Sequence, residues 1–261
     1  MLFTKDMVAF DYDCDSAQRL KISAAMRYMQ QTSAEHLNHL GLPYEKLYRE
    51  NMVFLLSKSC IKIFDMPVAG EEIVVGTAAV ATRGARFVRE FVIDDPKGNR
   101  MLSAFTLWIL VDPNTRRILR PQSFPYDLTF QQEAATQGEI ADIALPKDAD
   151  PDIGVLTDLS IRYSHIDCNG HVNNSFYADF VCDALPVESL LSKGLDTIVL
   201  SYHNEAKWGD VITMRTNAQS GNGYYVRGGK KDGSPCFEAL AVLKESAAER
   251  EVKRWISTKA Y

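Results

Sequence analysis

Long apolar runs, an excess of basic residues and paired cysteines are all missing from this chain of 261 residues. No window approaches the roughly 18 consecutive apolar residues of a transmembrane helix. The formal net charge of −5 argues against a nucleic-acid binder with a dominant basic face. The five cysteines are odd in number and contain no CxxC pair, so neither a disulfide framework nor a zinc ribbon is indicated. We expect reduced, mostly buried thiols. Because no basic and then apolar segment opens the chain, we also expect a cytoplasmic protein.

Several catalytic motifs are absent as well. The sequence has no G-x-S-x-G, G-x-x-x-x-G-K-[ST], G-x-G-x-x-G or H-E-x-x-H. Serine-hydrolase, P-loop, dinucleotide-binding and zincin functions therefore lose their usual support. Neither a cofactor nor a metal ion is expected.

One segment differs in composition from the rest of the chain. Residues 131–152 hold six acidic residues, one lysine and two prolines, whereas the sequences on either side are nearly neutral. A polar, acidic, proline-containing stretch between balanced segments is typical of a linker. We predict an N-terminal unit at 1–130, a linker at 131–152 and a C-terminal unit at 153–261.

The two units resemble each other in sequence. Four short matches occur in the same order, with an offset that falls along the chain because the second copy has shorter connections. The paired segments are 15–23 and 167–175, 56–57 and 200–201, 69–71 and 208–210, and 105–111 and 237–243. We infer an internal duplication.

Each copy has one helical pattern followed by strand patterns. Apolar residues recur at helical spacing from Ile22 to Leu40, before Gly41 and Pro43, and again from Phe176 to Leu185. Strand patterns cover 53–64, 71–82, 86–94 and 101–112 in the first copy, and 196–207, 211–219, 223–230 and 235–244 in the second. This order predicts an α+β fold, a tandem (double) hot-dog in which each unit is a long helix wrapped by an antiparallel sheet.

The histidine with the most informative neighbours is His171. The others are His36, His39, His165 and His203. Asp167, Asn169 and His171 alternate, and in extended chain alternate side chains project to one side. Asn173 and Asn174 follow as N-cap candidates. The backbone N–H groups of that first turn, with Asn and His side chains, can stabilise an oxyanion. The alternative is a capped loop with no catalytic task.

The same motif resembles the D-x-N-x-H-V-N-N signature of acyl-ACP thioesterases. Asp167-Cys-Asn-Gly-His-Val-Asn-Asn174 carries the resemblance, and residues 175–186 are similar to the family's next helix. Leu20 to Gln30, Trp208-Gly-Asp210 and the tandem arrangement are similar too. The resemblance covers nearly the whole chain.

The resemblance implies four catalytic residues. The family's Asp, Asn and His fall on Asp167, Asn169 and His171. Its second segment, L-E-Y-R-R-E-C in plant members, matches Leu200-Ser-Tyr-His-Asn-Glu205-Ala206, so the family's Glu falls on Glu205. Alanine stands where the family has cysteine, so no nucleophile is available at position 206.

The implied reaction is direct hydrolysis of a fatty acyl thioester. Glu205 or His171 takes a proton from water, Asn169 and the helix-start N–H groups hold the oxyanion, and Asp167 orients Asn169 or the loop. Cys168 is the only rival nucleophile, and we expect it to pack beside the helix start. A hot-dog β-hydroxyacyl dehydratase or a non-catalytic acyl-binding protein are the alternatives.

The implied partner is acyl carrier protein (ACP), which is strongly acidic. Docking would then use a local basic patch, while ordinary solvated surface charge is the alternative. The candidate patches are Arg83, Arg86 and Arg89, or Arg116, Arg117 and Arg120. No nucleic acid and no membrane span are expected, and a homodimer is left open.

The first copy lacks the catalytic residue types. Asp15, Ala17 and Arg19 stand where the second copy has Asp167, Asn169 and His171, and an offset of 144 places Ile61 opposite Glu205. Alanine cannot hydrogen-bond a carbonyl through its side chain, and arginine stays protonated. We therefore expect one catalytic centre per chain, built mainly by 153–261, with Ile61 in a wall for the acyl chain.

Overall fold

The computed structural model describes residues 2–128, 154–218 and 223–245. The elements of the first unit are β1 (Phe3–Val8), α1 (Ile22–His39), α2 (Tyr44–Arg49), β2 (Val53–Ile63), β3 (Glu72–Arg83), β4 (Arg86–Asp94) and β5 (Arg100–Val111). Those of the second are β6 (Gly154–Ser160), α3 (Phe176–Asp183), α4 (Val187–Lys193), β7 (Leu195–Tyr202), β8 (Val211–Ala218), β9 (Gly223–Lys230) and β10 (Pro235–Leu243). Short 3₁₀ turns lie at Asp11–Asp13, Pro121–Ser123 and Tyr163–His165.

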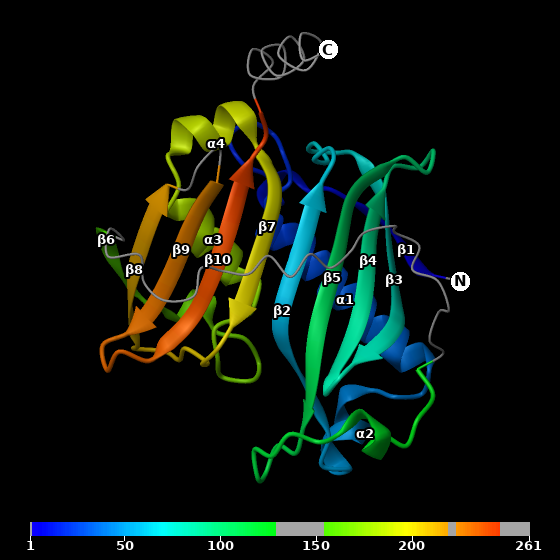
Figure 1. The fold of residues 1–261 in the computed structure, drawn as a ribbon. Helices are drawn as coiled ribbons and strands as arrows, with labels where there is room; N and C mark the ends of the chain where they lie inside the picture. Colours follow the sequence, from blue (N-terminus) through cyan, green and yellow to red (C-terminus); the bar gives the residue numbers. More distant parts are fainter. Residues whose placement is uncertain (1, 129–153, 219–222, 246–261) are drawn as a thin grey trace, which may run out of the picture.

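The ten strands of the described residues form a single antiparallel sheet, in the order β1-β3-β4-β5-β2-β7-β10-β9-β8-β6. The first five strands of this order come from the first unit and the last five from the second (Figure 1). The units meet where β2 pairs with β7, from Lys58 opposite Ser201 to Lys62 opposite Thr197. The two sheets are therefore joined edge to edge into one.

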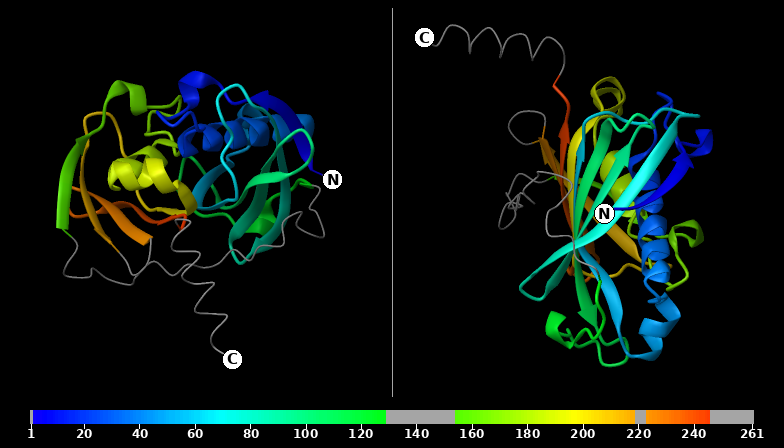
Figure 2. Two further views of the ribbon diagram at one scale, coloured as in Figure 1. Left: turned by 90° about the horizontal axis from the view of Figure 1, so that it is seen from above. Right: turned by 90° about the vertical axis from the view of Figure 1, so that its right-hand side faces the viewer.

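The two central helices, α1 and α3, cover the same face of this sheet (Figure 2). They contact each other, and one apolar core runs under both. Strand β2 contributes to this core with alternate side chains. Ser59, Ile61 and Ile63 are buried, while the residues between them are not. The α+β tandem hot-dog architecture predicted from the sequence is confirmed.

The predicted elements agree with most of the observed boundaries. Helix α1 ends at His39, and Gly41 follows in the left-handed region at φ +72°, where its N–H bonds to Asn38 O. The strand predicted over 196–207 is too long, because β7 ends at Tyr202. The second central helix is only eight residues long. Strands β1 and β6 and helices α2 and α4 were not predicted. The predicted linker at 131–152 lies outside the described residues, so the domain boundaries stay a prediction.

The turn before each central helix has the same hydrogen bonds, which supports the inferred duplication. The Asp15 N–H donates to Arg19 O at 2.7 Å, and the Asp167 N–H donates to His171 O at 2.9 Å. The two turns are 152 residues apart, as the first sequence match requires. An isolated bridge closes each one, Cys14 with Leu20 and Ile166 with Val172.

A close approach between two strands holds the second helix in place. At Gly228 of β9, an added Cβ would lie 2.2 Å from a ring carbon of Phe237 and 2.8 Å from Ile212. The Phe237 ring in turn makes an edge contact with Tyr177 of α3, with centroids 5.1 Å apart. Glycine at 228 is therefore needed for the ring that supports α3.

We predict that Gly228→Ala destabilises the protein by roughly 1–3 kcal/mol, the usual cost of forcing extra volume into a packed core. The control is Gly229→Ala at the next position, where the nearest atom would be Ser234 O at 3.7 Å. That variant should stay within about 0.5 kcal/mol of the parent. Urea unfolding followed by circular dichroism measures both, and equal effects would contradict the packing argument.

Candidate functional site

The loop at 167–171 is a tight turn and not extended chain. The Asp167 carboxylate accepts the Asn169 N–H at 2.8 Å, and the Gly170 N–H returns to Asp167 O at 3.0 Å. Gly170 takes φ +77°, which glycine adopts without steric cost. The predicted alternation of side chains is therefore wrong. The Asp167 carboxylate thus bonds to the backbone of its own loop, and its expected role in catalysis stays a prediction.

His171 and Glu205 come together at the end of this turn. His171 Nε2 lies 3.0 Å from Glu205 Oε2, and the two side chains are 23% and 34% exposed. The chain at Glu205 is held on one side by a hydrogen bond from the Val172 N–H to Ala206 O at 2.9 Å. Two segments 34 residues apart thus place an imidazole against a carboxylate, where water still reaches both.

Asn169 lies at the rim of this arrangement. Its side chain is exposed, and its Oδ1 accepts a long hydrogen bond of 3.4 Å from the Tyr44 hydroxyl. Tyr44 belongs to α2 of the first unit. Burial raises the pKa of Tyr44, and the nearby Tyr48 adds to the effect, so this phenol stays protonated near neutral pH and can donate.

The N-cap residue of α3 is Ser175, without a side-chain cap hydrogen bond to the helix, so the prediction of Asn173 or Asn174 as the N-cap is wrong. Asn173 Oδ1 accepts from the Ser175 N–H at 3.0 Å and from the Ser175 hydroxyl at 2.7 Å. The Phe176 N–H donates to Asn173 O at 3.0 Å. These two N–H groups are therefore occupied, and the expectation that they hold an oxyanion has to be corrected. Asn174 has a different place, described below.

Cys168 does not pack beside the helix start, because its side chain is exposed. The described cysteines are all free, but only Cys236 is buried, so the expectation of mostly buried thiols is wrong. No group of three or more His, Cys, Asp or Glu side chains suited to a metal ion occurs in the described residues.

The other histidines make contacts of their own. His36 is buried against Arg89, and burial together with this positive charge lowers its pKa to about 4. His165 accepts the Arg162 N–H, and His39 lies against the ring of Phe3. His203 forms a second histidine–carboxylate pair with Glu238, at 3.2 Å. That pair resembles the His171–Glu205 pair in distance and provides a control for it.

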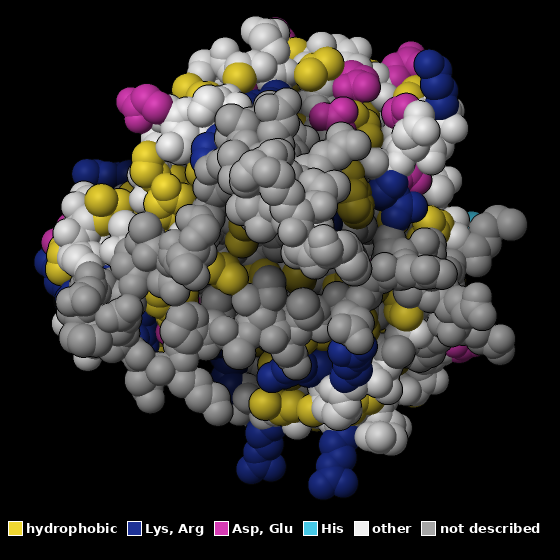
Figure 3. Space-filling model, turned by 45° about the horizontal axis from the view of Figure 1, so that its top comes forward, with side chains coloured by type: hydrophobic (Ala, Val, Ile, Leu, Met, Phe, Trp, Pro, Cys, Tyr) yellow, Lys and Arg dark blue, Asp and Glu magenta, His cyan; other side chains and the backbone are white. Residues whose placement is uncertain are grey.

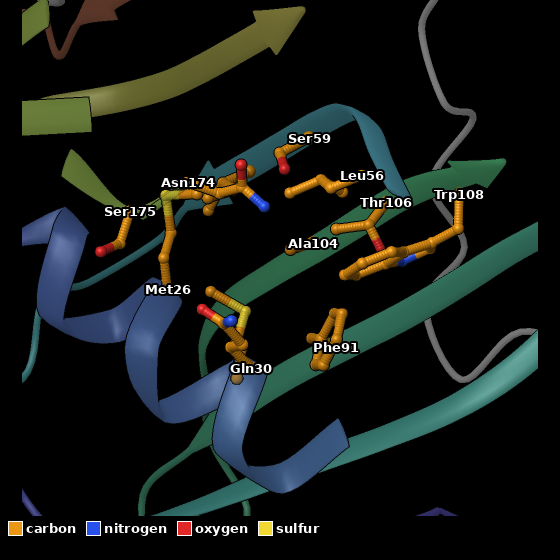
Figure 4. A pocket seen from close by; sticks show the side chains of 12 residues that line it. Met26, Gln30, Leu56, Ser59, Phe91, Ala104, Thr106, Trp108, Asn174 and Ser175 are labelled. Carbon is orange, nitrogen blue, oxygen red and sulfur yellow. The ribbon is translucent and has the colours of Figure 1, made fainter. Parts of the chain in front are cut away.

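An apolar pocket lies in the first unit, between α1 and the strands β2, β4 and β5 (Figure 4). The cavity itself is small, about 30 Å³, and the space rises to about 410 Å³ only when the open solvent at its mouth is counted. Ile61 lies in its wall, as predicted, and Asn174 and Ser175 of the second unit complete it. These two residues follow His171 by three and four positions, so the segment that carries His171 leads into the lining of the pocket.

The sequence match that placed Ile61 opposite Glu205 needs correction. The Val172 N–H bonds to Ala206 O in the second unit, and the Leu20 N–H bonds to Pro67 O in the first. Ala206 therefore corresponds to Pro67, and Glu205 to Met66, with an offset of 139. Methionine is no more a proton acceptor than isoleucine, so the first unit still lacks the carboxylate.

Arg116 was not expected to contact the catalytic candidates. Its Nη1 lies 3.4 Å from Glu205 Oε2 and 3.5 Å from Oε1. Arg116 adopts φ +59°, which is uncommon for a residue other than glycine. The turn that carries it is fixed by Asp112, whose carboxylate accepts the N–H groups of Asn114 and Thr115. No local sequence signal links positions so far apart.

The two candidate docking patches differ in the structure. Arg89 is buried and bonds to His36 and Thr77, so it cannot belong to a surface patch. Arg116, Arg117 and Arg120 are all exposed. Figure 3 shows charges of both signs interspersed on the face that it presents, with Lys and Arg projecting at its lower edge.

We predict that Arg116→Ala lowers the rate of the expected thioester hydrolysis by roughly two- to fivefold. This is the size of effect that losing a largely exposed ion pair usually has. The physical reason is loss of the guanidinium that orients Glu205. Steady-state kinetics should show the loss in kcat, and Arg116→Lys should recover part of it. Arg117→Ala removes the same charge from the same turn without this contact, so it should leave kcat unchanged even if weaker binding of an acidic partner raises KM. Equal losses of kcat in the two alanine variants would sink the positioning role.

Comparisons with known proteins agree on one family. A model of the acyl-ACP thioesterase N-terminal domain matches residues 1–123, and a model of the C-terminal domain matches 149–234. An acyl-[acyl-carrier-protein] hydrolase of Cuphea viscosissima is 23% identical over 238 residues, which cover 86% of this chain and 57% of that protein. A palmitoyl-acyl carrier protein thioesterase of Gossypium hirsutum is 21% identical over 85% of this chain and 56% of that protein. The chain thus spans somewhat over half the length of these curated relatives.

Solved structures share the fold. A crystal structure of an acyl-ACP thioesterase from Bacteroides thetaiotaomicron superposes with a TM-score of 0.80 at 22% identity, covering 93% of this chain and 98% of that one. The 12:0-ACP thioesterase from Umbellularia californica gives a TM-score of 0.84 at 19% identity, covering 94% and 98%. No helix among the described residues is long and apolar enough to cross a membrane.

Proposed function

Because the chain belongs to the acyl-ACP thioesterase family, we propose that it hydrolyses the thioester of fatty acyl-ACP and so ends chain elongation. The products are a free fatty acid and ACP. The observation that carries the proposal is the His171–Glu205 contact of 3.0 Å, in a chain segment that continues into Asn174 and Ser175 of the apolar pocket.

The reaction is direct attack by water. The water oxygen forms a bond to the carbonyl carbon while one of its protons passes to the His171–Glu205 pair. The carbon–sulfur bond then breaks, and the proton goes to the departing thiolate. His171 Nε2 and Glu205 share one hydrogen bond, so the pair accepts the proton as a unit, whichever side chain lies nearer the water.

Asn169 provides the side-chain donor for the oxyanion. Two N–H groups at the start of α3 are occupied, which leaves the exposed Asn169 amide as the main candidate. The Tyr44 hydroxyl, which donates to Asn169 Oδ1, directs the Asn169 NH₂ group away from itself. Asp167 holds the backbone of the loop and does not touch the substrate.

The acyl chain enters the pocket of the first unit. The lining is mostly apolar, with Met26, Ile61 and Phe91 among its residues, and burial of methylene groups there favours binding. Each chain then has one catalytic centre, to which the second unit gives the reacting groups and the first gives most of the acyl site.

ACP is the proposed partner. An acidic carrier would meet Arg116, Arg117 and Arg120, which are exposed and of which Arg116 contacts Glu205. The domain boundaries at 130 and 153 and a cytoplasmic location stay predictions.

We predict that His171→Ala and Glu205→Ala each lower thioester hydrolysis by roughly two to four orders of magnitude, the range for an acid–base group. The measurement is thiol release from palmitoyl-ACP with a thiol reagent, with folding checked by circular dichroism. His203→Ala, which breaks the other histidine–carboxylate pair, should retain near-normal activity. Near-normal turnover in either site variant would remove that residue from the mechanism.

The same assay separates the alternative functions. A non-catalytic acyl-binding protein would retain acyl-ACP without releasing thiol. A dehydratase would instead convert a β-hydroxyacyl chain to an enoyl chain, which mass spectrometry detects.

We also predict that no cysteine is the nucleophile. Ala206 stands at the family's cysteine position, and Cys168 is exposed on the turn. Cys168→Ser should therefore keep full activity, and mass spectrometry should find no acyl group on the protein during turnover. An acyl adduct on Cys168 would require a covalent mechanism in place of water attack.

A further inference from the structure

Two contacts cross from the first unit to the catalytic candidates of the second. The Tyr44 hydroxyl on α2 donates to Asn169 Oδ1 at 3.4 Å, and Arg116 Nη1 lies 3.4 Å from Glu205 Oε2. Each contact is long and lies near the surface, so either one alone would hold its partner weakly. Together they reach both segments of the site from the same unit.

The strand pairing between the units stops short of the catalytic loops. The pairing of β2 with β7 runs from Lys62 to Lys58, and Ser201 is the last residue that it includes on β7. Strand β7 itself ends at Tyr202, so Glu205 lies beyond the pairing and beyond the strand. At this end of the seam, side-chain contacts therefore have to fix the loops of the second unit against the first.

The two elements of the first unit that make these contacts are joined to each other. Strand β2 begins at Val53 opposite Val111, the last residue of β5, so the chain before β2 adjoins the turn after β5. Between these segments Asn114 Nδ2 donates to Asn51 Oδ1 at 2.7 Å. The Asn51 N–H in turn donates to Tyr48 O at the end of α2, at 3.0 Å. One short hydrogen bond thus ties the helix to the turn.

The backbone on both sides of this bond has a defined conformation. Asn51 and Arg116 each adopt φ +59°, in the left-handed region that few residues other than glycine and asparagine enter. In the 112–117 turn, the Asp112 N–H donates to Arg117 O at 2.9 Å, and the Arg116 N–H returns to Asp112 O at 2.9 Å. The side chain of Asn114 therefore joins two closed turns.

We propose that the first unit positions the catalytic groups of the second through a clamp, formed by Tyr44, Asn51, Asn114 and Arg116. One arm of the clamp holds Asn169 and the other holds Glu205, and the bond between the two asparagines keeps the arms at a constant separation. Catalysis depends on the distance between the proton acceptor and the oxyanion donor, which lie on different segments. This inference rests on the proposed thioesterase function and gives positioning residues for it.

The first test removes the phenol hydroxyl from one arm. We expect Tyr44→Phe to lower kcat for palmitoyl-ACP by roughly three- to tenfold, the effect of one lost hydrogen bond, with little change in KM. The loss should disappear in an Asn169→Ala background, because the hydroxyl then has no group to position. Tyr48→Phe is the matched control and should keep full activity, since its ring lies on the same helix with its centroid 5.9 Å from that of Tyr44.

The second test breaks the bond between the arms. Asn114→Ala should lower kcat by roughly two- to fivefold, and the loss should shrink in an Arg116→Ala background, where one arm is already gone. Asn99→Ala is the control, because the Asn99 amide also makes an exposed hydrogen bond of 2.7 Å, to Asp95 in the hairpin between β4 and β5. This control should retain the kcat of the parent protein.

Circular dichroism checks that each variant is folded. A parent value of kcat in either Tyr44→Phe or Asn114→Ala, or an equal loss in the matched control, overturns the clamp and leaves the thioesterase function standing. So does a Tyr44→Phe loss that keeps its size in the Asn169→Ala background. Failure of the parent protein to release thiol from palmitoyl-ACP overturns both.

Discussion

The pairing of β2 with β7 is the constraint on which the site depends. Ten strands form one sheet only because Lys58 to Lys62 hydrogen-bond with Thr197 to Ser201, which also removes the two edges that separate units would expose. The pairing holds the two units together, and Asn174 and Ser175 of the second unit line the pocket of the first. If the two units were separate, the first would have the apolar pocket without the His171–Glu205 pair, and the second would have the pair without the pocket.

Duplication explains why the two units share a backbone turn but carry different side-chain pairs on it. Both retain the turn before the central helix, with equivalent hydrogen bonds at Asp15 and Asp167. In the first unit Arg19 pairs with Asp15 at 3.1 Å, whereas His171 in the second is paired with Glu205 and stays accessible to water. The same backbone therefore supports an Arg19–Asp15 ion pair in one copy and, in the other, the His171–Glu205 pair that we propose to be catalytic.

The sequence predicts local features well and contacts between distant segments poorly. Helix α1 and the four long strands of the first unit follow from apolar periodicity, which depends on neighbours in the chain. The partnership of Glu205 with His171 came only from family resemblance, because nothing in a lone strand-end glutamate indicates a partner. Arg116 and Tyr44 were missed because their contacts span the seam between units. Asp167 was assigned to extended chain, since alternation does not distinguish a strand from a turn stabilised by its own carboxylate.

The central claim is that one site spans both units, with the thioester at His171 and the acyl chain in the first. A crystal structure with an acyl-pantetheine analogue whose thioester is replaced by an unreactive thioether tests it most directly. We expect one analogue per chain, with its sulfur end beside His171 and Glu205 and its hydrocarbon between α1 and β4. Hydrocarbon found under α3 in the second unit, or a headgroup remote from His171, would contradict the account.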